Sequence, residues 1–82
     1  MTEHELKTWP KYFQEILDGK KKFELRKNDR NFELEDILYL KEWSPETQLY
    51  TGRSVKLKVI YMVKYFIGLE PGYVIMGIEV IK

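Results

Sequence analysis

Hydrophobic and polar residues alternate along most of this chain, which is typical of β-strands, and only one segment has helical spacing. A short strand is predicted over residues 4–7. Apolar side chains then recur every three or four positions from Trp9 to Leu17, which predicts an amphipathic helix. Thr8 is the predicted N-cap of this helix, Pro10 fits its first turn, and Gly19 ends it.

The remainder of the chain is predicted to be strands separated by turns. The expected strands cover residues 21–27, 37–43, 49–51, 53–64 and 73–81, with turns at residues 28–31, 44–48 and 70–72. In the long strand, the odd-numbered positions from Val55 to Val63 share one face, but Ile60 and Met62 make the far end of the other face apolar too. Such a strand is expected to bend, with a further bulge or bend at Gly52. The pattern therefore predicts a mainly β (α+β) fold, a small closed or half-closed β-barrel of about five or six strands whose one helix follows the first strand and covers one end.

Composition favours one domain over residues 1–82, held together by packing. The chain is 44% hydrophobic and 33% charged, which is typical of a globular protein. It has no cysteine and one histidine, His4, so we expect no disulfide, no metal site and no cofactor. No apolar run approaches the ~20 residues of a membrane span, and the N-terminus has no signal-peptide pattern. A cytoplasmic protein without membrane association is expected.

Charge is concentrated in one part of the sequence. The net charge is only +1, which argues against a general binder of polyanions. Residues 20–30, however, hold six basic and two acidic side chains and carry +4. This segment is therefore the first candidate for contact with an anionic ligand.

Glu24 and Arg26 share one face of the strand predicted over residues 21–27, and Phe23 and Leu25 are expected to anchor the other face in the core. In a concave site, Arg26 would bind a carbonyl or phosphate, and Glu24 would accept a hydrogen bond from a base edge. The alternative is a solvated face whose ion pairs are worth only about 0–1 kcal/mol. Strict alternation places Lys21 on the Phe23 face, so either Lys21 precedes the regular strand or the two sides do not form one site.

The tryptophans are further candidates for ligand contact, because Trp9 and Trp43 could stack on bases. At least one is expected to fill the core, and Trp43, beside a proline turn, is expected to be the more exposed. His4 is more often structural than catalytic in such a context.

Nearly the whole chain resembles the ASCH family, in particular its short bacterial and phage branch. The resemblance rests on residues 4–10, on the long run 19–30, and on shorter segments at 35–38, 43–47, 50–53 and 68–73. It implies a PUA-like β-barrel with a pocket on its helix-capped side for RNA or modified nucleotides. The family pattern Gly-x-Lys-x-x-Glu-x-Arg falls on Gly19, Lys21, Glu24 and Arg26.

Some small ASCH relatives look like amidohydrolases that act on acylated cytidine with a lysine, a threonine and a downstream glutamate. Lys21 matches that lysine, but Glu24 stands at the threonine position. The insertion that would carry the downstream glutamate is missing between Val63 and Gly72.

Three hypotheses follow. The first is a non-enzymatic module that binds RNA or a nucleotide. Its expected ligand-contacting residues are Lys7, Trp9, Lys21, Glu24, Arg26, Lys27, Asn28, Arg30, Trp43 and Tyr73. The second is a small amidohydrolase acting on an acylated nucleoside, with Lys21 and Glu24 as the catalytic residues. The third is an accessory module for a protein partner, which predicts an exposed apolar patch around Tyr65 and Phe66.

Overall fold

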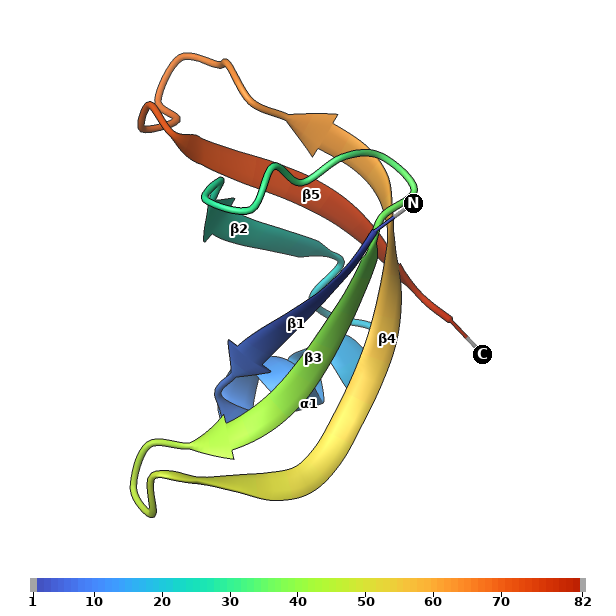
Figure 1. Cartoon of the computed structure of the whole chain (residues 1–82), viewed down its shortest axis with the longest axis vertical. Helices are drawn as coiled ribbons and strands as arrows, with labels where there is room; N and C mark the ends of the chain where they lie inside the picture. The colour runs from blue at the N-terminus through green and yellow to red at the C-terminus, as the bar shows by residue number, and fades with distance from the viewer. Residues whose placement is uncertain (1, 82) are drawn as a thin grey trace.

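Residues 2–81 form five strands and one helix, in the order β1 (Glu3–Thr8), α1 (Pro10–Leu17), β2 (Phe23–Lys27), β3 (Ile37–Ser44), β4 (Leu49–Val63) and β5 (Tyr73–Val80). In the computed structural model, which describes residues 2–81, the strands make one sheet in the order β1-β3-β4-β5-β2. β1 pairs with β3 in parallel, and the other pairs are antiparallel. The sheet curls into a half-barrel, with α1 near the ends of β1 and β3 (Figure 1). The predicted mainly β fold with one helix after the first strand is confirmed.

The start of the helix differs from the prediction. Trp9 occupies the N-cap position without a side-chain hydrogen bond, and Pro10 is the first helical residue, as expected. Thr8 is the last residue of β1 rather than the cap, since it still pairs with Glu42 of β3, and its hydroxyl accepts a hydrogen bond from Arg26 Nη2 at 3.3 Å. Gly19 has a φ of +76° directly after the C-cap residue, which confirms that it ends the helix.

The core lies inside the curl and contains apolar side chains from every element except β2. Its buried members are Leu6, Ile16, Phe32, Leu38, Leu40, Leu57, Val59, Val74, Met76 and Ile78. α1 adds Phe13, which is also buried, so the helix closes one end of the core. Neither tryptophan belongs to the core, which contradicts the expectation that at least one would fill it.

β2 is turned the opposite way from the prediction. Phe23 and Leu25 are 50% and 52% exposed, whereas Glu24 is only 3% exposed. β2 is an edge strand that pairs with β5, and Glu24 and Arg26 stand opposite the core residues Met76 and Val74, so the polar side chains of β2 share the inner face of the sheet. Glu24 can be buried there because cationic side chains bind both of its carboxylate oxygens.

β4 bends through two irregularities in its pairing. Opposite β3, two extra residues are accommodated around Gly52, which has a φ of +94°, so the expected bend is confirmed. Opposite β5, Ile60 is an extra residue between Val59 and Tyr61. The bulge exchanges the two faces, so that Met62 packs against the core and Tyr61 is exposed. The predicted single face from Val55 to Val63 therefore holds only as far as Val59.

His4 has a structural role on β1. Its Nε2 lies 2.8 Å from Oδ2 of Asp36, and its ring packs edge-on against Phe32. Asp36 also accepts hydrogen bonds from the backbone amides of Thr2 and Glu33, each at 3.0 Å. Burial raises the pKa of Asp36, but the hydrogen bonds from His4 and the two amides outweigh burial and hold this pKa below its usual value. The carboxylate thus ties the start of the chain to the loop before β3.

Within residues 2–81, no helix has the length and apolar character needed to cross a membrane.

Candidate functional site

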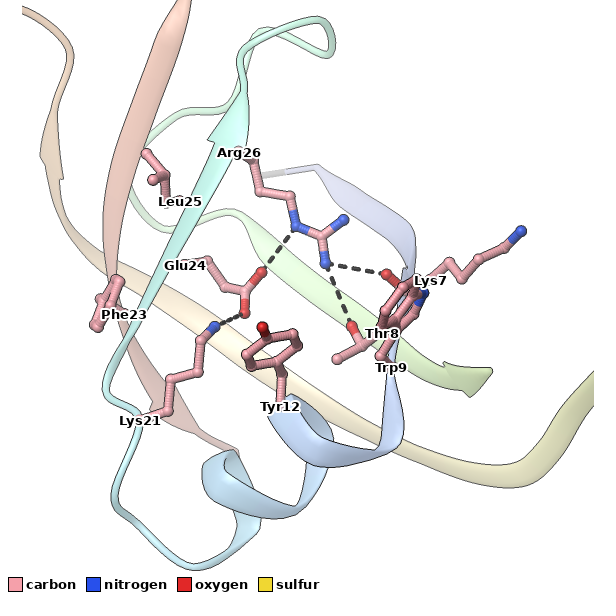
Figure 2. A pocket seen from close by; sticks show the side chains of 9 residues that line it. All are labelled: Lys7, Thr8, Trp9, Tyr12, Lys21, Phe23, Glu24, Leu25 and Arg26. Atoms are coloured by element: carbon pink, nitrogen blue, oxygen red, sulfur yellow. Dashed lines mark hydrogen bonds and ion pairs between the residues drawn. The ribbon is translucent and has the colours of Figure 1, made fainter. Parts of the chain in front are cut away.

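A cavity of about 600 Å³ lies where β2 faces the end of β1 and the start of α1 (Figure 2). Two short segments of the chain supply its whole lining, which consists of Lys7, Thr8, Trp9, Tyr12, Lys21, Phe23, Glu24, Leu25 and Arg26. β1 and β2 are the two edges of the sheet, so the cavity sits at the seam of the half-barrel.

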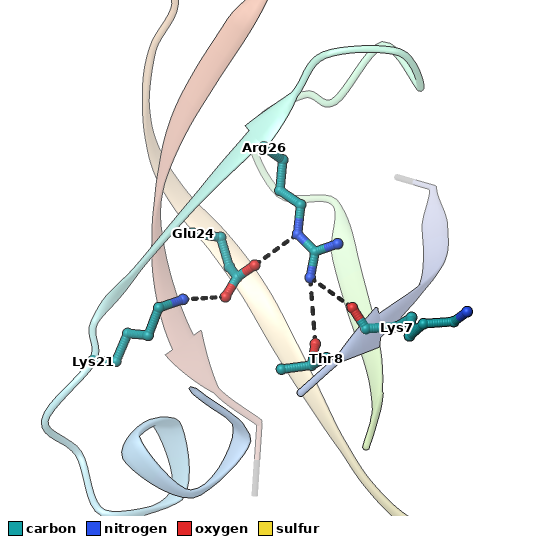
Figure 3. Close-up of polar contacts among 5 residues, drawn as sticks. All are labelled: Lys7, Thr8, Lys21, Glu24 and Arg26. Atoms are coloured by element: carbon teal, nitrogen blue, oxygen red, sulfur yellow. Dashed lines mark hydrogen bonds and ion pairs between the residues drawn. The ribbon is translucent and has the colours of Figure 1, made fainter. Parts of the chain in front are cut away.

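Glu24 is the centre of the polar network in this pocket. Its Oε1 accepts a hydrogen bond from Lys21 Nζ, and its Oε2 accepts one from Arg26 Nε at 2.8 Å (Figure 3). Lys21 precedes β2, and its side chain turns toward Glu24, so the three residues form one site. The first of the two alternatives for Lys21 is therefore confirmed. With two cations on one buried carboxylate, the network keeps a charge of +1.

Arg26 also connects β2 to β1 across the seam. Its Nη2 donates to the backbone carbonyl of Lys7 at 3.1 Å and to Oγ1 of Thr8 at 3.3 Å. The planar guanidinium thereby contacts a carboxylate, a carbonyl and a hydroxyl with one set of donors. The Arg26 side chain therefore links the two edge strands of the sheet.

Three aromatic side chains surround the polar network. Trp9, Tyr12 and Phe23 all line the cavity, and each exposes about half of its surface. The Lys21 ammonium lies 5.9 Å from the Tyr12 ring and 5.3 Å from the Phe23 ring. The pocket therefore combines cations with accessible aromatic surface.

Lys7 contributes its backbone to the pocket, while its side chain points away from Glu24 (Figure 3). Its ammonium lies 4.1 Å from the ring centroid of Trp43. Trp43 is half-buried and lies outside the pocket lining, whereas Trp9 is 52% exposed. The prediction that Trp43 is the more exposed tryptophan is therefore wrong, because the strand end that carries it is covered by Lys7.

Besides Trp43, four of the predicted contact residues lie outside this cavity. Lys27 and Tyr73 are opposite each other at the far end of the β2–β5 pair. Asn28 accepts a hydrogen bond from the amide of Phe32 at 3.0 Å, and Arg30 donates to the carbonyl of Glu5 at 2.8 Å. Asn28 and Arg30 thus hold the loop after β2 in place, and the pocket receives only Lys7, Trp9, Lys21, Glu24 and Arg26 of the ten expected residues.

Four lining residues were not predicted as site residues: Thr8, Tyr12, Phe23 and Leu25. Phe23 and Leu25 were expected to lie in the core. Thr8 was assigned to the helix cap and Tyr12 to the apolar stripe of the helix. A usable signal for Thr8 is its place on the inward face of β1, two residues after Leu6. A polar side chain at that position requires a hydrogen-bond partner, which Arg26 provides.

Metal ligands do not gather in the described part of the chain. Among residues 2–81, no group of three or more His, Asp or Glu side chains is placed so that it could hold a metal ion.

The loop between β4 and β5 exposes a second, apolar surface. Tyr65, Phe66 and Ile67 are 92%, 73% and 98% exposed, as the third hypothesis predicted. Phe66 and Ile67 also line an apolar cavity of about 490 Å³ next to Leu25. That a protein partner covers this surface stays a prediction.

Together, the curled sheet and the charged, aromatic pocket at its seam define a small half-barrel domain with one candidate ligand site. Residues 3–78 match the family described as "Domain of unknown function (DUF3850)", and the chain belongs to this family. The chain is also similar to the "Uncharacterized 12.9 kDa protein in GpA 3'region" of Escherichia phage P2, with 46% identity over 56 residues. The match covers 68% of this chain and 50% of the phage protein, so the chain spans about half the length of this relative.

Proposed function

We propose that this domain binds a nucleotide, free or within single-stranded RNA, in the pocket between β1 and β2, and that it is a PUA-like domain of the ASCH type. The observation that carries the proposal is the convergence of Lys21, Glu24 and Arg26 on one cavity with exposed aromatic side chains around it. A nucleotide is the common ligand that combines an anionic phosphate, a flat aromatic base and a polar base edge.

The charge of the pocket suits the phosphate. Two cations, Lys21 and Arg26, and one anion, Glu24, place their charged groups in the pocket, which gives +1. Lys21 donates only one of its three ammonium protons to Glu24, and Arg26 Nη1 has no hydrogen-bond partner within residues 2–81. These donors are available to an anion without loss of the existing network.

The shape of the pocket suits the base. Its volume of about 600 Å³ lies within the ~300–1,000 Å³ of small-molecule sites. Trp9, Tyr12 and Phe23 offer half-exposed rings, and a stacked base gains about 1–3 kcal/mol from an aromatic side chain. Because Lys27 and Arg30 lie outside the cavity, the arrangement favours capture of one nucleotide over a continuous track for a polymer.

The proposal is tested by calorimetric titration of the domain with the four 5′-mononucleotides and with a single-stranded pentaribonucleotide of mixed sequence. Trp9→Ala is expected to weaken binding roughly 5- to 150-fold, which corresponds to the loss of one stacking contact. Arg26→Gln is expected to weaken it and to reduce its salt dependence, since log K falls with log [salt] in proportion to the phosphates neutralised.

Lys22→Gln is the matched control, because it removes the same charge from the same basic segment. The Lys22 side chain is exposed and lies outside the pocket, while its backbone carbonyl still accepts from the Ile78 amide. Unchanged binding in Lys22→Gln is expected. Absence of binding to every nucleotide and RNA at low salt, or equal losses in Lys22→Gln and Arg26→Gln, would overturn the proposal.

A second candidate function is hydrolysis of an acylated nucleoside, and the direct contact between Lys21 and Glu24 inside the pocket favours it. Glu24 would act as general base on water, and the amide would break into a carboxylic acid and the free base amine. Lys21 in this geometry is an ammonium paired with a carboxylate, so it suits stabilisation of the carbonyl oxygen better than nucleophilic attack. Incubation with a panel of acylated cytidines tests this function. Release of acid that stops in Lys21→Ala and Glu24→Gln would support it, and no release would exclude it.

A further inference from the structure

The polar groups of the pocket form a row with a defined order of donors and acceptors. Lys21 Nζ binds Oε1 of Glu24, Oε2 of Glu24 binds Arg26 Nε, and Arg26 Nη2 binds Oγ1 of Thr8 (Figure 3). From Lys21 to Thr8, the row therefore offers a donor, two acceptors and then donors again.

Each member of this row has unused hydrogen-bonding capacity. A carboxylate can accept about four hydrogen bonds, and Glu24 accepts two from the described residues. Lys21 has two further ammonium protons. The Thr8 hydroxyl accepts from Arg26, and its own proton has no acceptor within residues 2–81. A ligand can thus bind along the row while the existing bonds remain.

Base edges differ in whether they complement this order. Guanine presents the O6 acceptor, then the N1–H and N2–H donors, so that Lys21 can donate to O6 while both Glu24 oxygens accept. Uracil presents O4, N3–H and O2, an acceptor, a donor and an acceptor, which also fits but gives Glu24 one proton instead of two. Adenine and cytosine present an amino donor beside a ring-nitrogen acceptor. Their amino group would face the Lys21 ammonium and their ring nitrogen the Glu24 carboxylate.

We propose that the pocket selects bases with a keto group beside a ring N–H, guanine first and uracil second, over adenine and cytosine. The inference rests on the proposed nucleotide-binding function and names the ligand class of the same site. The proposed selectivity requires Glu24 to accept hydrogen bonds from the base edge, with Lys21 and Thr8 on either side of Glu24.

Burial of Glu24 makes the discrimination strong. The residue is only 3% exposed, so water cannot easily take the place of a missing donor when the wrong base is bound. A site built to hydrogen-bond its ligand rejects analogues that leave buried polar groups unpaired. A good bidentate contact to a base discriminates by about 1–3 kcal/mol, so GMP is expected to bind roughly 5- to 150-fold more tightly than AMP or CMP.

Calorimetric titration of the intact chain with GMP, UMP, AMP and CMP at one salt concentration tests the selectivity. The expected order is GMP, then UMP, then AMP and CMP. Inosine monophosphate, which lacks the N2 amino group, is expected to bind between GMP and AMP. 1-Methyl-GMP, which lacks the N1 proton, is expected to lose the advantage of GMP. A pentaribonucleotide of adenosines and a second one with a central guanosine show whether the base is also taken from RNA, since the strand with guanosine should then bind more tightly.

Glu24→Gln tests whether Glu24 recognises the base edge, because glutamine has nearly the same size but places an NH₂ donor in the row. The variant is expected to weaken GMP binding while AMP and CMP binding stays the same or improves. The base analogues test the same point on the unaltered protein, so the proposal remains testable if the variant does not fold.

Different results would overturn the base preference and the nucleotide-binding function. Binding of AMP or CMP within twofold of GMP, or equal binding of GMP and 1-methyl-GMP, overturns the base preference and leaves nucleotide binding in place. Absence of binding to all four nucleotides and both oligonucleotides overturns the nucleotide-binding function and, with it, the preference.

Discussion

Replacement of Asp36 by asparagine is expected to destabilise the fold strongly, although the two side chains have almost the same shape. Oδ1 of Asp36 accepts from the Thr2 amide at 3.0 Å, and Oδ2 accepts from His4 Nε2 at 2.8 Å and from the Glu33 amide at 3.0 Å. Asparagine can keep the Thr2 bond and can donate to a His4 tautomer that accepts. Its NH₂ group then faces the amide hydrogen of Glu33, so one buried bond is replaced by two opposed donors.

The magnitude follows from these contacts. A hydrogen bond to a charged group contributes about 1.5–3 kcal/mol, and a buried amide without a partner costs about 1–3 kcal/mol. Loss of the Glu33 bond, together with the weaker neutral bonds to Thr2 and His4, gives about 2–4 kcal/mol. A domain of this size has about 4–12 kcal/mol of total stability. The melting temperature is expected to fall by roughly 10–30 °C.

Denaturant titration and thermal melting at neutral pH measure this effect, with Asp29→Asn as the matched control. Asp29 is exposed and has no hydrogen bond within residues 2–81, so the same chemical change should alter stability by less than about 0.5 kcal/mol. A loss in Asp36→Asn no larger than that of the control would refute the argument that the carboxylate holds this part of the chain.

The effect also has a defined pH dependence. Because folding lowers the pKa of Asp36, the unfolded chain takes up the proton first as the pH falls. The stability that Asp36 contributes is therefore complete above the usual aspartate pKa of about 4 and is lost as the pH drops through the lower pKa of the folded state. The difference between the wild type and Asp36→Asn should shrink below about pH 4. A difference that stays constant down to pH 2 would contradict this account.

Three further predictions concern packing, backbone conformation and surface. Leu57→Ala removes a fully buried core side chain and should cost about 2–5 kcal/mol in denaturant titration; a loss below 1 kcal/mol would contradict the assigned core. Gly52→Ala should cost about 1–2 kcal/mol in thermal melting because of its φ of +94°, even though open space surrounds the added methyl group. Ile67→Ser should change the free energy of unfolding by less than about 0.5 kcal/mol, since Ile67 is 98% exposed. In analytical ultracentrifugation this variant should reduce any self-association through the apolar loop. A marked loss of stability would contradict the exposed position of this loop.

The parts of the fold that depend on neighbouring residues in the sequence could be predicted. Alternation, turn residues and the position of Gly19 were enough to place every strand and the helix to within a few residues. The apolar Ile60 and Met62 indicated a change of facing in this strand, but the extra residue at Ile60 could not be located, because the position of a bulge is determined by pairing with β5.

The candidate site was predicted in part, and its orientation was predicted wrongly. The charged segment identified Lys21, Glu24 and Arg26, but the rule that apolar side chains face the core turned β2 the wrong way. Glu24 faces inward because Lys21 and Arg26 neutralise it. Thr8, which supports Arg26, lies on a strand far away in the sequence. The pairing of a buried charge depends on tertiary contacts, so hydrophobic periodicity alone does not predict it.

The arginine contacts at the seam have a consequence for behaviour at high concentration. β1 is an edge strand, and the carbonyls of Glu5 and Lys7, two residues apart, point to the same side of it. Free carbonyls on a sheet edge can pair with a strand of another molecule, which leads to aggregation. Arg30 and Arg26 already bind these two carbonyls with charged, bulky guanidinium groups. The same arginine that completes the pocket thus protects the first strand from becoming a template for polymeric sheets.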